Sequence, residues 1–248
     1  MLLAGVGLFT REGGAMLFRW GHFLAGITWI GLLYYFNFVQ TPAFVAFEAG
    51  PRTEATRKLV PRALWWFRYG ALFTVLTGLL VLGFQDQFRN DYFKTTSGIA
   101  IATGILFGLI MFLNVWGIIW RKQKIVIANA EATAAGGQAN PAAAGAARQA
   151  ACASRTNTLF SIPLLFFMGA AGHFAAVTGL NYTPSGGDRM TYWLVVLAIV
   201  VIFEGIALSA PAAGKPQAWH IDNHRNTIIL GFVLWAILIA AFQILFKA

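Results

Sequence analysis

Two histidines carry the strongest chemical signal in this sequence. His22 and His173 each lie inside a long apolar stretch, about five residues after the start of the first and about seven residues before the end of the fourth. At about 1.5 Å per helical residue, both lie roughly 7–11 Å below the same membrane face. Two imidazoles at matched depth on different helices are what bis-imidazole ligation of a haem needs, so we predict a haem held by His22 and His173.

Small residues surround both histidines. The segment 169–176 is Gly-Ala-Ala-Gly-His-Phe-Ala-Ala, and Gly21, Ala25 and Gly26 flank His22. Such residues let a flat macrocycle approach the backbone. The alternative is that they allow close helix packing, with each histidine hydrogen-bonded to a neighbouring helix.

A second histidine pair, His220 and His224, precedes the last apolar stretch. If the helix begins early, the pair stands at positions i and i+4 on one face and can hold a metal ion. Glu204, near the end of the fifth stretch, could face the same pocket. The alternative is an ordinary helix start, capped by Asp222 or Asn223, and no third ligand with a firm spacing is evident.

Three polar residues inside the apolar stretches are candidates for catalysis. Asn37, Asn114 and Glu204 would all lie toward the cytoplasmic halves of their helices, where buried polar groups are costly and often functional. The competing interpretation for the asparagines is hydrogen bonding between helices.

The elements that position these residues must be membrane helices. Apolar residues make up 58% of the 248 residues, charged residues only 11%, and the mean hydropathy is +0.66. Soluble domains carry about 25% charged residues. We therefore predict an all-α integral membrane protein, with residues 1–248 as one membrane domain in the lipid bilayer of a bacterial inner membrane.

Charge and cysteine content exclude other classes. The net charge is +9, but the basic residues lie in short clusters between apolar runs, as at lipid headgroups, so we predict no nucleic-acid partner. The only cysteine, Cys152, excludes an internal disulfide and a c-type haem attachment motif.

Six apolar stretches are long enough to cross the hydrocarbon. We predict spans at about 17–40, 63–84, 97–120, 158–180, 190–210 and 227–246. Twelve of the eighteen Lys and Arg residues then fall on one side, which should be cytoplasmic, so both termini are expected in the periplasm. Residues 1–16 are predicted as an interfacial lead-in and 125–156 as a mobile, Ala-rich cytoplasmic loop, with a short surface helix as an alternative.

Several segments resemble the membrane domain of bacterial urate hydroxylases, the urate oxidase N-terminal family. They are Trp20-Gly21-His22-Phe23, Gly26-Ile27-Thr28-Trp29-Ile30-Gly31, Tyr34-Tyr35-Phe36-Asn37-Phe38, Phe112-Leu113-Asn114-Val115-Trp116-Gly117 and Ser154-Arg155-Thr156-Asn157-Thr158, the last leading into Pro163 and His173. The first-helix pattern is also similar to the membrane protoporphyrinogen oxidase and copper-resistance permease group, whose association with haem b implies His22 as a ligand.

The resemblance implies a redox function. We expect a haem-b electron-transfer module related to urate hydroxylase, with a purine-like substrate. Family members continue into a cytochrome c domain, whereas this sequence ends at Ala248 without a haem-c motif. We therefore expect a separate cytochrome c or another membrane subunit to accept the electrons. Two alternatives stay open: a non-catalytic subunit of a respiratory or photosynthetic complex, and a proton-coupled transporter using Glu204.

Overall fold

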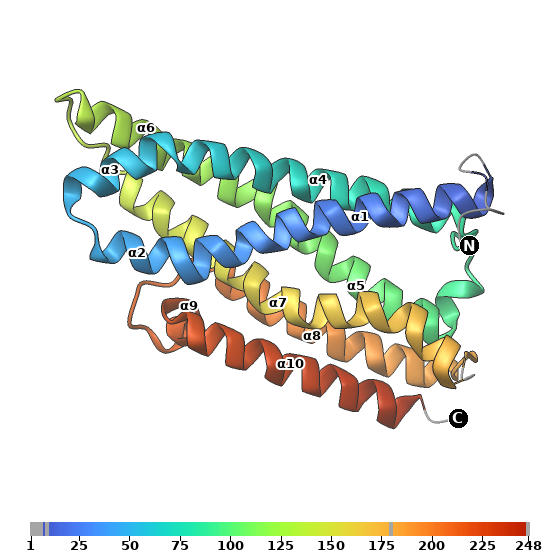
Figure 1. Cartoon of the computed structure of the whole chain (residues 1–248). Helices are drawn as coiled ribbons and strands as arrows, with labels where there is room; N and C mark the ends of the chain where they lie inside the picture. The colour runs from blue at the N-terminus through green and yellow to red at the C-terminus, as the bar shows by residue number, and fades with distance from the viewer. Residues whose placement is uncertain (1–6, 8–9, 179–180, 247–248) are drawn as a thin grey trace.

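The computed structural model describes residue 7, residues 10–178 and residues 181–246, with only the backbone at 174–178. All regular structure in this part of the chain is helical, and the helices form an elongated bundle (Figure 1). The long helices are α1 (Arg11–Tyr34), α4 (Val60–Phe84), α5 (Thr96–Leu113), α6 (Trp120–Ala134), α7 (Ala143–Thr178), α8 (Gly186–Ser209) and α10 (His224–Leu245). The shorter elements are η1 (Tyr35–Gln40), α2 (Thr41–Ala46), α3 (Ala49–Lys58), η2 (Tyr92–Lys94), η3 (Asn114–Ile119), η4 (Pro216–Ala218) and α9 (Trp219–Asp222).

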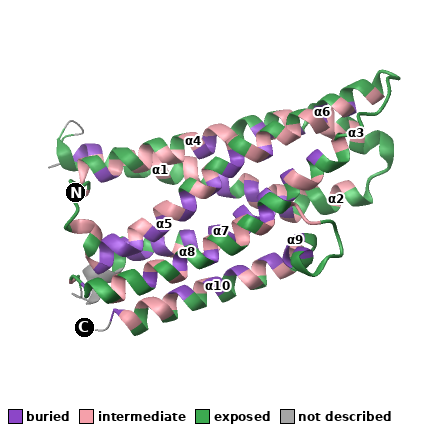
Figure 2. Ribbon diagram, turned by 180° about the vertical axis from the view of Figure 1, so that it is seen from behind, coloured by how far each residue is buried: buried purple, intermediate pink, exposed green. Residues whose placement is uncertain are grey.

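The outer surface of the bundle is apolar. Large side chains such as Ile27, Leu113 and Val201 are 70%, 64% and 69% exposed, and exposed residues run along the outward faces of the helices (Figure 2). A water-soluble protein rarely exposes apolar surface of this extent. The helices satisfy their own backbone hydrogen bonds, which is the condition for facing lipid.

Five helical stretches among the described residues are long and apolar enough to cross a membrane. They are Arg11–Ala46, Val60–Phe84, Thr96–Ala134, Gly186–Ser209 and His224–Leu245. The sixth predicted span, 158–180, coincides with α7 as far as Thr178, and residues 179–180 are outside the described residues. The structure therefore shows a multi-helix membrane fold, while six crossings remain a prediction.

The helices form a pair beside a larger group. α1 runs along α4, and their backbones meet closely at Gly70, where a Cβ would lie 3.2 Å from the Trp29 nitrogen. α7 is central, because it contacts α1, α5, α6, α8, α9 and α10. The start of α1 and the end of α10 lie at one end of the bundle, and α2, α3 and α9 lie at the other (Figure 1).

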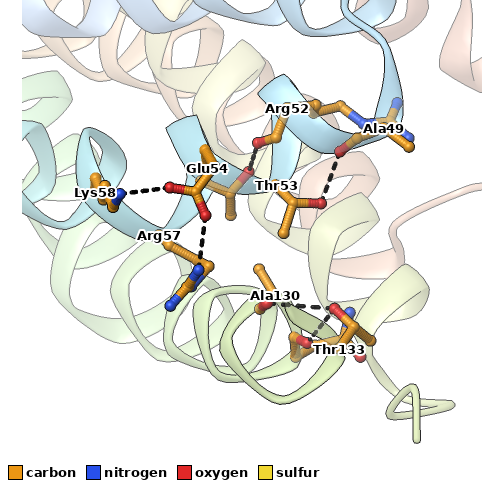
Figure 3. A network of polar contacts seen from close by, with 10 residues as sticks. Ala49, Arg52, Thr53, Glu54, Arg57, Lys58, Ala130 and Thr133 are labelled. Carbon is orange, nitrogen blue, oxygen red and sulfur yellow. Dashed lines mark hydrogen bonds and ion pairs between the residues drawn. The ribbon is translucent and has the colours of Figure 1, made fainter. Parts of the chain in front are cut away.

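The basic end of the bundle is built from α3 and α6. α3 packs against α6, and its Glu54 is paired with Arg57 at 2.7 Å and with Lys58 at 2.6 Å (Figure 3). This end lies opposite the two chain termini (Figure 1).

The predicted loop over 125–156 is largely wrong. α6 continues to Ala134 and α7 begins at Ala143, so the connection is only 135–142. The chain does break where the glycines and proline occur, since Gly136 has a positive φ of 79°. Alanine favours helix strongly, so the flanks extend as helices on either side of that break. The predicted lead-in at 1–16 is partly outside the described residues, and from Arg11 onward it is helix.

Two of the long helical runs contain π-helical segments. η1 continues α1, and η3 joins α5 to α6. Each has six residues, and each contains one of the predicted asparagines, Asn37 or Asn114. π-Helical turns inside α-helices are often found at functional sites.

Candidate functional site

His22 is fixed against the neighbouring helix α4. Its Nδ1 lies 2.8 Å from the Thr74 carbonyl oxygen and 3.3 Å from Thr77 Oγ1, and its ring rests on Gly78. Because a carbonyl oxygen can only accept, Nδ1 carries the proton and Nε2 keeps its lone pair. This tautomer is the one in which an imidazole binds a metal through Nε2.

His173 has the same arrangement on α7. Its Nδ1 lies 3.1 Å from the Gly169 carbonyl oxygen, one turn earlier in the helix. The side chain is exposed. Here too Nδ1 must donate, so Nε2 is the nitrogen with the free lone pair.

A cleft of about 820 Å³ lies between α1 and α7 at the end of the bundle that holds the chain termini. It is lined by small residues (Ala15, Ala171 and Gly172), by Arg19 and by polar side chains that include Gln85 and Asn181. The volume is within the range of roughly 300–1,000 Å³ typical of ligand and cofactor sites. The cleft is therefore large enough to receive a sizeable group.

Residues close in sequence to each of the two histidines line this cleft. Gly172 lines it beside His173, and Arg19 lines it one helical turn before His22. Neither histidine is itself part of the lining, and no described contact joins the two.

The structure moves the helix start from which the depth of His22 was counted. α1 begins at Arg11, so His22 lies about 16 Å from its helix start rather than about 7 Å. His173 is about 7 Å from the last residue of α7. Helix ends do not mark the faces of a membrane, so the matched depth of the two histidines stays a prediction.

The second group of functional candidates lies toward the other end of the bundle. Asn114 Nδ2 lies 2.9 Å from Asn157 Oδ1 and 3.1 Å from Glu204 Oε2. Asn157 Nδ2 in turn donates to the Met111 carbonyl at 2.9 Å. Asn114 and Glu204, two of the three polar candidates for catalysis, are thus hydrogen-bonded to one another.

Asn37 belongs to the same level of the bundle but not to the Glu204 cluster. It is 3% exposed, and its Nδ2 donates to Ser154 Oγ and to the Leu33 carbonyl, both at 2.8 Å. Ser154 and Asn157 are three residues apart on α7, so the asparagines from η1 and η3 contact neighbouring positions on one face of this helix. We call the residues Asn37, Asn114, Ser154, Arg155, Thr156, Asn157, Glu204 and His220 the polar layer.

The pair His220 and His224 is divided between two helices, as in the alternative of an ordinary capped helix start. The helix is interrupted at Asn223, so His220 ends up in α9 and His224 begins α10, and the two are not on one face of a continuous helix. Asn223 caps α10 by accepting from the Arg225 nitrogen at 2.9 Å. Among the described residues, no three His, Cys, Asp or Glu side chains gather into a metal site.

Short helix α9 is held against α7 by a charged pair. Asp222 Oδ1 accepts from Arg148 NH1 at 2.7 Å, and Oδ2 accepts from the Gly214 nitrogen at 2.8 Å. Burial acts to raise the pKa of Asp222, but these donors and the Arg148 charge outweigh it, so the pKa lies below its usual value. Burial lowers the pKa of His220, and the nearby Asp222 carboxylate offsets this only in part.

The buried polar residues of α7 were not singled out from the sequence as candidate site residues. Arg155, Thr156 and Asn157 are 6%, 0% and 0% exposed, in the middle of the bundle. The signal was present as five consecutive polar residues, 154–158, but it lay next to an Ala-rich segment that was interpreted as a loop. A run of five polar residues within a helix that contacts six others is a candidate site in its own right.

The fold and these buried polar groups define a helical membrane protein with two candidate sites, one at each end of the bundle. The model of the Urate oxidase N-terminal family matches residues 87–236, and the chain belongs to this family. The matched segment contains the polar layer except Asn37, and it contains His173 but not His22. No curated protein and no solved structure matches the chain.

Proposed function

We propose that the chain is a haem-b redox module of the inner membrane, in which His22 and His173 would hold the haem iron. The observation that carries the proposal is the state of the two imidazoles. Each donates from Nδ1 to a backbone carbonyl, at 2.8 Å for His22 and 3.1 Å for His173, and each presents Nε2. A backbone acceptor on the second nitrogen is the usual way in which a protein orients a metal-bound histidine.

The cleft lies one helical turn from His22 and next to His173, and this position supports the proposal. Its walls are small at Ala15, Ala171 and Gly172, and it is lined by Arg11 and Arg19. Guanidinium groups suit the two propionate carboxylates of haem b. Arg19 has no ion pair among the described residues, whereas Arg11 lies 3.5 Å from Asp86.

The residues of the chain would set the properties of the site. His22 is oriented by α4, and its ring position is limited by Gly78, so its orientation depends on the contact between α1 and α4. When bound, the haem supplies one-electron redox chemistry, with urate-class purines as the electron source and a periplasmic cytochrome c as the acceptor.

The proposed orientation places both termini in the periplasm. α3, with Arg52, Arg57 and Lys58, and the start of α4 lie at the end opposite the termini (Figure 1). Excess Lys and Arg mark the cytoplasmic side of a membrane protein. The cleft would then open near the periplasmic face, where a cytochrome c can dock.

A visible difference spectrum tests the proposal. The purified protein, reduced with dithionite, should show a b-type α band that is lost in His22→Ala and His173→Ala. His224→Ala is the matched control and should keep the band. A wild-type protein that carries no haem after mild purification would overturn the proposal.

A further inference from the structure

A hollow of about 360 Å³ lies at the first two turns of α4. It is lined by Pro61, Arg62, Trp65 and Trp66. The start of α4 lies at the end of the bundle opposite the chain termini (Figure 1). Indole rings beside a cation are the combination that membrane proteins place where lipid headgroups meet the hydrocarbon.

The aromatic wall of the hollow is held in place by ring contacts. The rings of Trp65 and Trp66 meet edge to face with their centroids 5.0 Å apart, and the Trp65 ring lies 4.6 Å from that of Tyr69. Both indoles remain accessible, since Trp65 is 46% and Trp66 59% exposed. The hollow is therefore formed by packing within the chain and is open toward its surroundings.

Arg62 is the cation of this hollow that can take an external partner. The neighbouring Arg68 is engaged within the chain, because its guanidinium carbon lies 3.4 Å from the centroid of the Trp120 ring. The Nε of Arg68 also donates to the Leu64 carbonyl oxygen at 3.3 Å. Arg62, in contrast, is exposed, and no ion pair among the described residues includes it.

The surroundings of Arg62 are poor in carboxylates. The sequence has no Asp or Glu at 55–85 or at 92–130, which cover α4, α5 and most of α6. Glu54 on α3 is the nearest carboxylate along the chain, and it is already paired with Arg57 and Lys58. The hollow therefore favours an anion and disfavours a headgroup that brings an ammonium group of its own.

An apolar stripe continues from the hollow along the same face of α4. Trp66, Phe73, Leu76 and Leu80 follow one another at spacings that keep them on one side of the helix. They are 59%, 54%, 44% and 41% exposed, so the stripe is not covered by other helices. From Trp66 to Leu76 the helix rises about 15 Å, which is half of the roughly 30 Å hydrocarbon core of a bilayer. The apolar track beside the cation is thus as long as one lipid leaflet is thick.

We propose that this face of α4 binds one anionic phospholipid. Arg62 pairs with its phosphate, Trp65 and Trp66 lie at the level of its glycerol backbone, and an acyl chain follows the stripe. A soluble anion would use the cation without the stripe, and a zwitterionic lipid would use the stripe but bring an unpaired ammonium group. The hollow and the cleft between α1 and α7 lie at opposite ends of the bundle, so the inference does not depend on haem being bound.

Native mass spectrometry of the full chain in detergent tests the inference. The probes are phosphatidylglycerol, which is anionic, and phosphatidylcholine with the same acyl chains, which is zwitterionic. The wild type should bind one phosphatidylglycerol in preference to phosphatidylcholine. In Arg62→Gln the affinity for phosphatidylglycerol should fall about fivefold, as expected when one basic side chain is removed from an anionic lipid.

Two further variants sharpen the test. Arg225→Gln is the matched control, because Arg225 is also an exposed cation in the first turn of an apolar helix, α10, and is not part of the lining of the hollow. It should keep the wild-type preference. Trp66→Leu keeps an apolar side chain without the indole and should bind phosphatidylglycerol more weakly than the wild type.

Four results would overturn the inference: equal binding of the two lipids by the wild type, an unchanged preference in Arg62→Gln, an unchanged affinity in Trp66→Leu, or an equal loss in Arg225→Gln. Glycerol 3-phosphate at the same concentration should not displace phosphatidylglycerol, because it cannot use the apolar stripe. Its displacement of the lipid would show a site for a soluble phosphate and would also contradict the proposal.

Discussion

The contact between α7 and α9 gives a prediction with a magnitude. Asp222 accepts hydrogen bonds from Arg148 NH1 and from the Gly214 nitrogen, and the side chains of Arg148 and Asp222 are 24% and 27% exposed. Asp222→Asn keeps the shape of the side chain and removes its charge. We expect the loss of this charge to release part of the attachment of α9 to α7.

The size of the effect lies between two limits. Hydrogen bonds to charged groups contribute about 1.5–3 kcal/mol, and exposed ion pairs about 0.2–1 kcal/mol. Because both side chains are about a quarter exposed, solvent screening reduces the first figure. We expect Asp222→Asn to lower the free energy of unfolding by about 1 kcal/mol at neutral pH.

The pH dependence of this effect has a definite sign. The pKa of Asp222 is lower in the folded protein, so the stabilisation is fully present above the unfolded value of about 3.9. It is lost as the pH falls through the folded pKa. The difference in stability between the wild type and Asp222→Asn should therefore shrink below about pH 4.

A double-mutant cycle with Arg148→Met measures the interaction. The free energy of unfolding in detergent is compared for the wild type, both single variants and the double variant. We expect a coupling energy of about 1 kcal/mol. A coupling energy of zero, or a stability difference that is unchanged in acid, would refute the reasoning.

Three other predictions follow from the same structure. In Gly78→Ala the new Cβ would lie 3.1 Å from His22 Cε1, so the imidazole must shift. We expect this variant to bind less haem than the control Gly31→Ala, whose added methyl group meets open space. The ratio of haem to protein, measured by absorbance, tests this prediction. Burial lowers the pKa of His220, so protonation of this side chain is less favourable in the folded protein than in the unfolded chain. The stability of the wild type should therefore fall as the pH drops below about 6.5. In thermal melts over a pH series, His220→Gln should lose less stability across that range than the wild type. Glu54 is paired only at the surface, so Glu54→Gln should leave the unfolding temperature unchanged in the same assay, and a clear loss would show that α3 depends on this pair (Figure 3).

The membrane character of the chain could be predicted from its sequence, because low charge and long apolar stretches leave few alternatives. The positions of α4, α8 and α10 agree with the predicted spans within a few residues. The first helix was placed too late because Arg11 and Glu12 are charged, although both lie in its first turn. A hydropathy pattern shows where a helix is apolar and does not show where it begins.

The polar layer could be predicted only in part. Asn114 and Glu204 stood out as polar residues within apolar stretches, and the structure bonds them. Asn157 and Arg155 were not singled out as site residues, because the groups around Asn157 come from a helix distant in sequence. The π-helical geometry of η1 and η3 also has no simple signature, since it depends on how Asn37 and Asn114 meet α7.

The axial ligation of the haem is the central claim, and the electron paramagnetic resonance spectrum of the oxidised protein tests it most directly. With both His22 and His173 as ligands, the wild type should give a low-spin ferric signal. Each of His22→Ala and His173→Ala should convert any haem that stays bound to a high-spin signal. A low-spin signal that persists unchanged in either variant would contradict the assignment of that histidine.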